Sequence, residues 1–139
     1  MMRVFLDTNV LMDTTEDRRF SLQSKSVLEL ARRGHFSLFA SYLTFANLNY
    51  LLRHRESSER YETIRKLHEE ITVLPNDDAQ LNAALTTEVK DFEDMLQYQC
   101  AKAAGCDIVV TNNGKDYHDF CDIPFMSTED FLIQIFSQL

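Results

Sequence analysis

The sequence predicts an α/β protein, a three-layer α/β/α sandwich built on a mainly parallel sheet of about five strands. Throughout its 139 residues, short apolar runs typical of buried strands alternate with longer segments whose apolar residues have helical spacing. The connections are short, and no linker or low-complexity stretch interrupts the chain. The length suits one hydrophobic core, so we expect a single domain spanning residues 1–139.

The first elements follow one another closely. Residues 4–6 are a short apolar run, and residues 7–9 favour a turn and the start of a helix. Helical spacing covers residues 21–33, and Gly34 favours the end of that helix. Residues 36–40 are expected to form the second strand.

The middle of the chain predicts two contrasting helices. Residues 42–54 are apolar almost all round, which predicts a deeply buried helix, whereas residues 58–70 form a polar, amphipathic helix. A third strand is expected over residues 71–74. A helix capped by Asn76 or Asp77 should then run to about Val89.

The last third repeats the alternation. Asp91 can cap a helix that runs to about Ala104, with Gly105 closing it. The sequence then predicts a strand over residues 108–110, a short strand over residues 124–126 and a helix after Ser127.

Composition excludes several classes of protein. The longest apolar runs are far shorter than the ~20 residues of a membrane span, so we expect a cytosolic protein without a membrane partner. Three cysteines (Cys100, Cys106 and Cys121) lack the spacing of a disulfide framework or a zinc site, which predicts reduced thiols. The net charge of −8 is uneven: residues 1–70 hold eleven basic and ten acidic side chains, and residues 71–139 hold three and twelve. A nucleic-acid partner therefore remains open.

Carboxylates stand at the ends of several expected elements: Asp7, Asp91, Asp94 and Asp116. Ligands bind parallel sheets at the carboxyl edge of the strands, where Asp7 and the loop after residue 110 should meet. Converging carboxylates repel one another unless a cation is bound, and oxygen ligands favour Mg²⁺ or Mn²⁺. A bound ion would acidify water for phosphodiester hydrolysis. Taken singly, each residue can equally be a helix cap or part of a turn.

Three segments resemble the motifs of the PIN-domain family, in order and spacing: LDTNVLMD (residues 6–13), DFEDMLQYQCAKAAGCDIVVT (91–111) and NNGKDY (112–117). The resemblance implies a PIN-like fold and a Mg²⁺- or Mn²⁺-dependent endoribonuclease, often the VapC-like toxin of a toxin–antitoxin pair. RNA, an antitoxin protein and a second copy of the chain are the expected partners. Asp7, Asp94 and Asp116 match the acidic positions of the family, so we expect them to be catalytic metal ligands.

Two positions depart from the family pattern, because Asn47 and Asn113 stand where acids are usual. An amide can coordinate through its oxygen but carries no charge, so metal affinity should fall. Asn47 is expected on a buried face, where an unpaired amide costs roughly 1–3 kcal/mol. Its polar partner should be the site itself, the backbone or Thr44. Groups expected to surround the ligands or replace them are Thr8, Asn9, Asn47, Asp91, Thr111 and Asn113.

Two other functions compete with the nuclease. Because two charges are missing, the chain could be a catalytically weak or inactive PIN domain that binds RNA or protein. An acid after an apolar strand also opens the motif of haloacid dehalogenase-like phosphatases, with Asp7 as nucleophile. Asn9 replaces the second acid of that motif. Such phosphatases also place a lysine from a following strand near the phosphate, whereas Lys90 precedes a helix here and Lys115 lies in an expected turn. The sequence therefore favours the nuclease.

Overall fold

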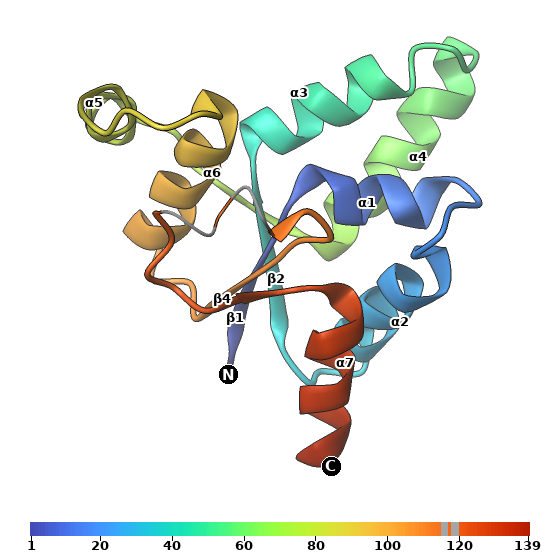
Figure 1. Cartoon of the computed structure of the whole chain (residues 1–139). Helices are drawn as coiled ribbons and strands as arrows, with labels where there is room; N and C mark the ends of the chain where they lie inside the picture. Colours follow the sequence, from blue (N-terminus) through green and yellow to red (C-terminus); the bar gives the residue numbers. More distant parts are fainter. Residues whose placement is uncertain (115–116, 118–119) are drawn as a thin grey trace.

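The computed structural model of the chain describes residues 1–114, 117 and 120–139 (Figure 1). The strands within this part are β1 (Arg3–Leu6), β2 (Ser37–Ser41), β3 (Thr72–Leu74), β4 (Ile108–Val110) and β5 (Phe125–Met126). The helices are α1 (Thr8–Thr15), α2 (Ser21–Arg32), α3 (Tyr42–Leu51), α4 (Ser57–Glu70), α5 (Asp78–Thr86), α6 (Phe92–Ala103) and α7 (Thr128–Ser137).

The five strands form one parallel sheet in the order β3-β2-β1-β4-β5. β1 lies in the middle, where Phe5 is in register with Phe39 of β2 and Val109 of β4. From β1 the chain builds outward through β2 to β3, then crosses to β4 on the other side. The expected parallel sheet of about five strands is confirmed. Successive strands are added on one side of β1 up to β3 and on its other side from β4 onward.

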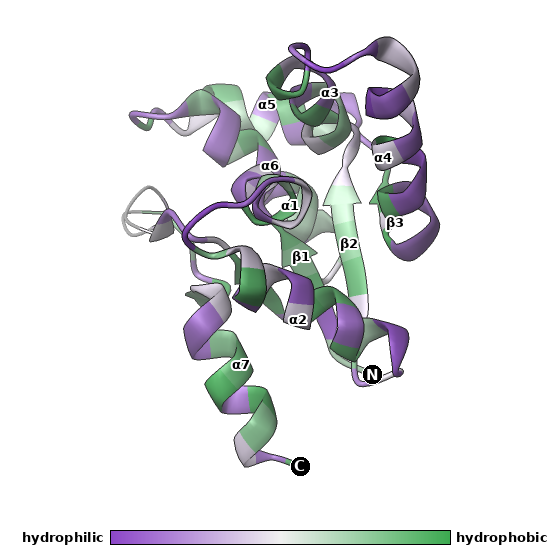
Figure 2. Ribbon diagram, turned by 90° about the vertical axis from the view of Figure 1, so that its right-hand side faces the viewer, coloured by the Kyte–Doolittle hydropathy of each residue, from purple (hydrophilic) through white to green (hydrophobic). Residues whose placement is uncertain are grey.

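Both faces of the sheet are covered by helices, as the expected three layers require. Successive strand residues point to opposite faces. Val4 and Leu6 therefore join one core cluster with residues of α1, α2, α3, α4 and α7, and Phe5 joins another with residues of α5 and α6. Figure 1 shows α5 and α6 on one side of the strands and α1, α2, α4 and α7 on the other. In Figure 2, β1 and β2 are hydrophobic whereas the outer helix α4 is largely hydrophilic.

The prediction that residues 42–54 form a deeply buried helix is wrong. Helix α3 ends at Leu51, its buried residues are Thr44 and Leu48, and Tyr42 and Tyr50 are 64% and 61% exposed. The reason is its position: α3 packs along one side on α1 and α4, while Asn47, Tyr50 and Leu51 line an open pocket. The apolar residues of α3 therefore serve partly to pack on the core and partly to line an open pocket.

The thiols agree with the expectation of reduced cysteines. Cys100, Cys106 and Cys121 are unpaired, the first two buried and the third half-buried. Burial raises the pKa of each thiol to about 11, so all three stay protonated near neutral pH. Within the residues that the structure describes, no helix is long and apolar enough to cross a membrane.

Candidate active site

Asp7 lies at the carboxyl edge of the sheet, directly after the middle strand β1. It caps α1, and its Oδ1 accepts the backbone N–H of Thr8 at 2.7 Å. Its Oδ2 accepts the Thr111 hydroxyl at 2.8 Å and the side-chain amide of Asn9 at 3.1 Å. The ends of β1 and β4 therefore meet, as the parallel order of these strands predicts.

The carboxylate form of Asp7 is held in a costly environment. The residue is only 6% exposed. Burial raises the pKa of its carboxyl above the ordinary value of 3.8, and hydrogen bonds from Thr111, Thr8 and Asn9 offset part of that rise. A bound cation would favour the charged form and remove this cost.

The second buried acid, Asp94, comes from the first turn of α6. Asp91 caps this helix by accepting the Asp94 backbone N–H at 3.1 Å, and Asp94 is 8% exposed whereas Asp91 is exposed. Burial, followed by the charges of Asp7 and Asp94, raises the pKa of the Tyr117 hydroxyl well above its ordinary value. Both carboxylates therefore lie near one buried ring.

An open pocket of about 480 Å³ brings most of the expected site residues together. Its lining includes Asp7, Thr8, Asn9, Arg18, Asn47, Asp91, Glu93, Asp94 and Asn113. Thr111 does not line the pocket but is buried next to Asp7. Its hydroxyl donates to Asp7 and accepts the backbone N–H of Asn113 at 3.1 Å. The remaining expected ligand, Asp116, lies outside the described residues. Among those that are described, no three His, Cys, Asp or Glu side chains are grouped as a metal site.

Asn47 contacts a residue that sequence reasoning missed. The expectation of a buried face is wrong, since Asn47 is half-buried in the pocket wall. Its Nδ2 donates to Glu93 Oε1 at 2.6 Å, so its partner belongs to the pocket and is neither Thr44 nor the backbone. Partial burial, then the charges of Asp91 and Asp7, raise the pKa of Glu93. The acidic run at residues 93–94 was the available signal, but only Asp94 matched the family position.

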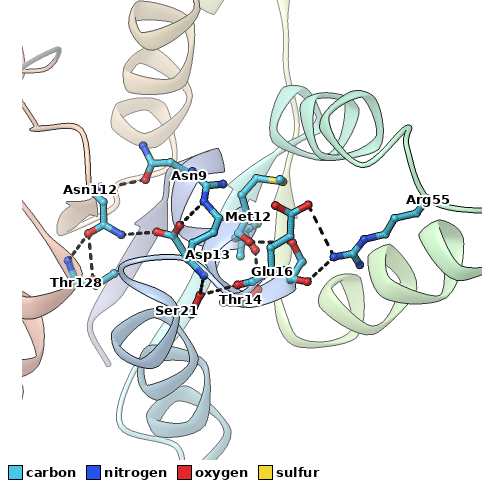
Figure 3. A network of polar contacts seen from close by, with 12 residues as sticks. Asn9, Met12, Asp13, Thr14, Glu16, Ser21, Arg55, Asn112 and Thr128 are labelled. Carbon is cyan, nitrogen blue, oxygen red and sulfur yellow. Dashed lines mark hydrogen bonds and ion pairs between the residues drawn. The ribbon is translucent and has the colours of Figure 1, made fainter.

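A polar network also missed from the sequence supports the floor of the site (Figure 3). Asn112 Nδ2 donates to Asp13 Oδ2 at 2.8 Å, and its backbone N–H donates to Asn9 Oδ1 at 3.0 Å. Its Oδ1 accepts both the backbone N–H and the hydroxyl of Thr128, at 3.1 and 3.0 Å. Asn112 thus fixes the loop after β4 against α1 and α7. The available signal was Asp13, an acid that follows the apolar run of α1 and is almost fully buried.

The chemistry of the pocket side chains bears on a bound cation. Oxygen ligands together with several retained waters are what Mg²⁺ or Mn²⁺ prefers. The donor set of the described residues, mainly carboxylate, amide and hydroxyl oxygens, therefore fits such an ion.

The raised pKa of Asp7 predicts that stability depends on pH. Below 3.8 this carboxyl is protonated in both folded and unfolded chains. As the pH rises between 3.8 and the higher folded pKa, the unfolded chain loses its proton first, so the free energy of unfolding falls. In EDTA, the melting temperature of the wild type should therefore fall relative to that of Asp7→Asn as the pH rises from about 4 to 7. A pH-independent difference in thermal unfolding would contradict this account.

Comparison with known proteins gives the same class of fold. A model of the PIN domain family matches residues 3–115. Ribonuclease VapC1 of Aquifex aeolicus (strain VF5) is 29% identical over 135 residues, which are 93% of this chain and 92% of that protein. VapBC2 of Rickettsia felis, solved with a DNA fragment from its promoter, has a TM-score of 0.71 at 15% identity, covering 91% of this chain and 98% of that one. Mycobacterium tuberculosis VapC20, described as a sarcin-ricin loop cleaving toxin, has a TM-score of 0.67 at 12% identity. The match covers 85% of this chain and 95% of VapC20.

Fold and site together define an α/β/α protein whose parallel sheet carries buried carboxylates at its carboxyl edge. The family model spans four of the five strands and most of the chain. This chain belongs to the PIN-domain family. The phosphatase alternative based on Asp7 as a nucleophile is thereby set aside.

Proposed function

We propose that this chain is a Mg²⁺- or Mn²⁺-dependent endoribonuclease and the toxin of a toxin–antitoxin pair. The observation that carries the proposal is the pair of buried acids, Asp7 and Asp94, on one pocket at the carboxyl edge of the sheet. The relatives named VapC1 and VapC20 support RNA as the substrate. A single domain spanning residues 1–139, residence in the cytosol and a homodimer belong to the same proposal.

Asp7, Asp94 and Asp116, which follows β4 in the sequence, would hold the divalent ion. When bound, such an ion acidifies a water molecule and stabilises the negative charge that develops on a phosphodiester. Thr111 and Asn9 orient the Asp7 carboxylate by hydrogen bonds to its Oδ2. The chain's own contribution is therefore to fix the ligand oxygens before substrate arrives.

The mouth of the pocket has groups suited to a nucleic acid. Arg18 lies on the pocket wall and is fixed by an ion pair with the buried Asp13, Nε to Oδ1 at 3.2 Å, while its side chain remains 44% exposed. This guanidinium can bind a phosphate. Tyr50 lines the same pocket, is exposed, and packs against the Arg53 guanidinium, 4.0 Å from its ring centroid. An exposed ring of this kind can stack on an unpaired base, which favours single-stranded RNA.

The proposed antitoxin partner is supported by likeness to proteins solved as toxin–antitoxin pairs, including VapBC-1 of nontypeable Haemophilus influenzae. The competing function, an inactive PIN domain that only binds RNA or protein, relied on the missing charges at Asn47 and Asn113. Glu93 places a carboxylate beside Asn47 in the pocket, so the structure does not favour that alternative.

The direct test uses the purified protein with single-stranded and structured RNA. Cleavage is expected with Mn²⁺, should stop with excess EDTA, and should return when Mn²⁺ is added beyond the EDTA concentration. Gel electrophoresis of end-labelled RNA measures all three states. Cleavage that resists EDTA, or intact RNA at every Mn²⁺ concentration, would contradict a metal-dependent nuclease.

A further inference from the structure

Arg18 is the only basic side chain among the described residues that line the acidic pocket. The acids on the same lining are Asp7, Asp91, Glu93 and Asp94. RNA carries a negative charge at every phosphate, so these acids repel it unless a positive group lies where it enters. The position of the Arg18 guanidinium therefore matters for any RNA that reaches Asp7.

The carboxylate that holds Arg18 is unusually buried. Asp13 Oδ1 lies 3.2 Å from Arg18 Nε, and the Asp13 side chain is only 4% exposed. In every other ion pair between described residues, the acidic side chain is at least 27% exposed. The cost of burying a carboxylate largely offsets its attraction to a cation, so net stability does not explain this pair. The contact is made at Nε, and the Nη nitrogens carry further N–H donors that can bind a phosphate.

A continuous chain of contacts joins Arg18 to Asp7 through Asp13. Asp13 Oδ2 accepts Asn112 Nδ2 at 2.8 Å, and the Asn112 backbone N–H donates to Asn9 Oδ1 at 3.0 Å (Figure 3). Asn9 Nδ2 in turn donates to Asp7 Oδ2 at 3.1 Å. The two oxygens of Asp13 thus tie the guanidinium to the groups that orient the Asp7 carboxylate.

We propose that Asp13 is a positioning residue for the substrate: it fixes the Arg18 guanidinium, which binds a backbone phosphate of the RNA, at a set place relative to Asp7. This inference rests on the proposed function, because the phosphate belongs to the same RNA. The contact itself requires no metal ion and no cleavage. It can therefore be measured as equilibrium binding, separately from catalysis.

The first test is fluorescence anisotropy of a labelled single-stranded RNA oligonucleotide with the full chain, in EDTA and at several KCl concentrations. Arg18→Gln should weaken RNA binding about tenfold, as expected for a lost charge-assisted hydrogen bond. It should also reduce the steepness of log Kd against log salt by about 0.7, the effect of one phosphate contact to a single strand.

Arg33→Gln is the matched control for the lost arginine. Arg33 Nε lies 3.1 Å from Glu29 Oε1, much as Arg18 Nε lies near Asp13. Arg33, however, follows α2 and precedes β2, so it lies at the amino edge of the sheet and not on the pocket. Its variant has the same net charge as Arg18→Gln and should keep nearly the wild-type affinity and salt dependence.

Asp13→Asn tests the positioning role by the sign of its effect. The variant removes a negative charge, so charge alone predicts tighter RNA binding. An asparagine can still accept the Asn112 amide but no longer attracts Arg18, so positioning predicts binding about threefold weaker. Glu29→Gln, the control, should bind RNA as tightly as the wild type or slightly more tightly. In the Arg18→Gln background, Asp13→Asn should cause no further loss, because its effect passes through Arg18.

Each outcome decides one part of the inference. Wild-type affinity and salt dependence in Arg18→Gln, or an equal loss in Arg33→Gln, would overturn the phosphate contact. Asp13→Asn that binds no more weakly than the wild type, or that weakens Arg18→Gln by the same factor as the wild type, would overturn positioning. A wild type that does not bind RNA in EDTA would overturn the whole inference, while cleavage in Mn²⁺ tests the proposed nuclease independently.

A second variant keeps the test decisive if thermal unfolding shows that Asp13→Asn does not fold. Arg18→Lys changes an exposed residue and keeps its charge, but lacks the planar fork that contacts a carboxylate and a phosphate together. It should bind RNA about threefold more weakly than the wild type. Wild-type affinity in Arg18→Lys would overturn the positioning role.

Discussion

Asp7→Ala is expected to lower the rate of RNA cleavage by about a thousandfold, equivalent to ~4 kcal/mol of transition-state stabilisation. Asp7 lies at the centre of the site, its Oδ2 is oriented by Thr111 and Asn9, and its loss would remove a ligand charge. Cleavage of labelled RNA in Mn²⁺ under single-turnover conditions measures the effect.

A matched control separates chemistry from the loss of a helix cap. Asp77 caps α5 by accepting the Gln80 backbone N–H at 3.0 Å, much as Asp7 caps α1, but it does not line the acidic pocket. Asp77→Ala should therefore lose about 1 kcal/mol of stability and keep its cleavage rate. Equal cleavage by the wild type and Asp7→Ala would identify a contaminating nuclease.

Asp94→Asn is expected to abolish stabilisation of the fold by Mn²⁺. At a free ion concentration one hundred times Kd, binding should stabilise the wild type by about 2.7 kcal/mol. That corresponds to a rise of roughly 9 °C in Tm for a chain of this length. Asp94 is buried in the pocket, so the variant loses a ligand charge and should show little or no rise.

Asp130→Asn is the matched control for this variant. Asp130 is the third residue of α7, as Asp94 is of α6. The backbone N–H of each residue donates to the side chain of its helix cap at 3.1 Å, Asp130 to Ser127 and Asp94 to Asp91. Because Asp130 is exposed and outside the pocket, its variant should retain the full Mn²⁺ response. An Asp94→Asn protein that responds like the wild type would rule out a site shared by Asp7 and Asp94.

The sequence is sufficient to predict the sheet and the position of Asp7. Short apolar runs such as residues 4–6 form strands, and the parallel order then places the residue after each strand at one edge. The same reasoning correctly assigned Asp91 as the cap of α6. These features depend on local pattern and on topology, both of which a single sequence contains.

Contacts between helices were beyond the reach of the same reasoning. Whether Glu93 reaches Asn47 depends on how α6 is turned toward α3, and the two residues are 46 positions apart along the chain. The exposure of α3 was missed for a similar reason, since an apolar residue such as Tyr50 has the same local pattern on a pocket wall as in a core. The placement of Asn112 required knowledge of α7 as well as α1.

The central position of β1 affects how the protein is made. Asp7 leaves the ribosome early, but the Thr111 hydroxyl that orients it follows 104 residues later. Until β4 emerges, one edge of β1 is unpaired and the nascent chain has no complete pocket. If the chain is a nuclease as proposed, this order of synthesis keeps a growing or prematurely terminated chain from carrying a complete site.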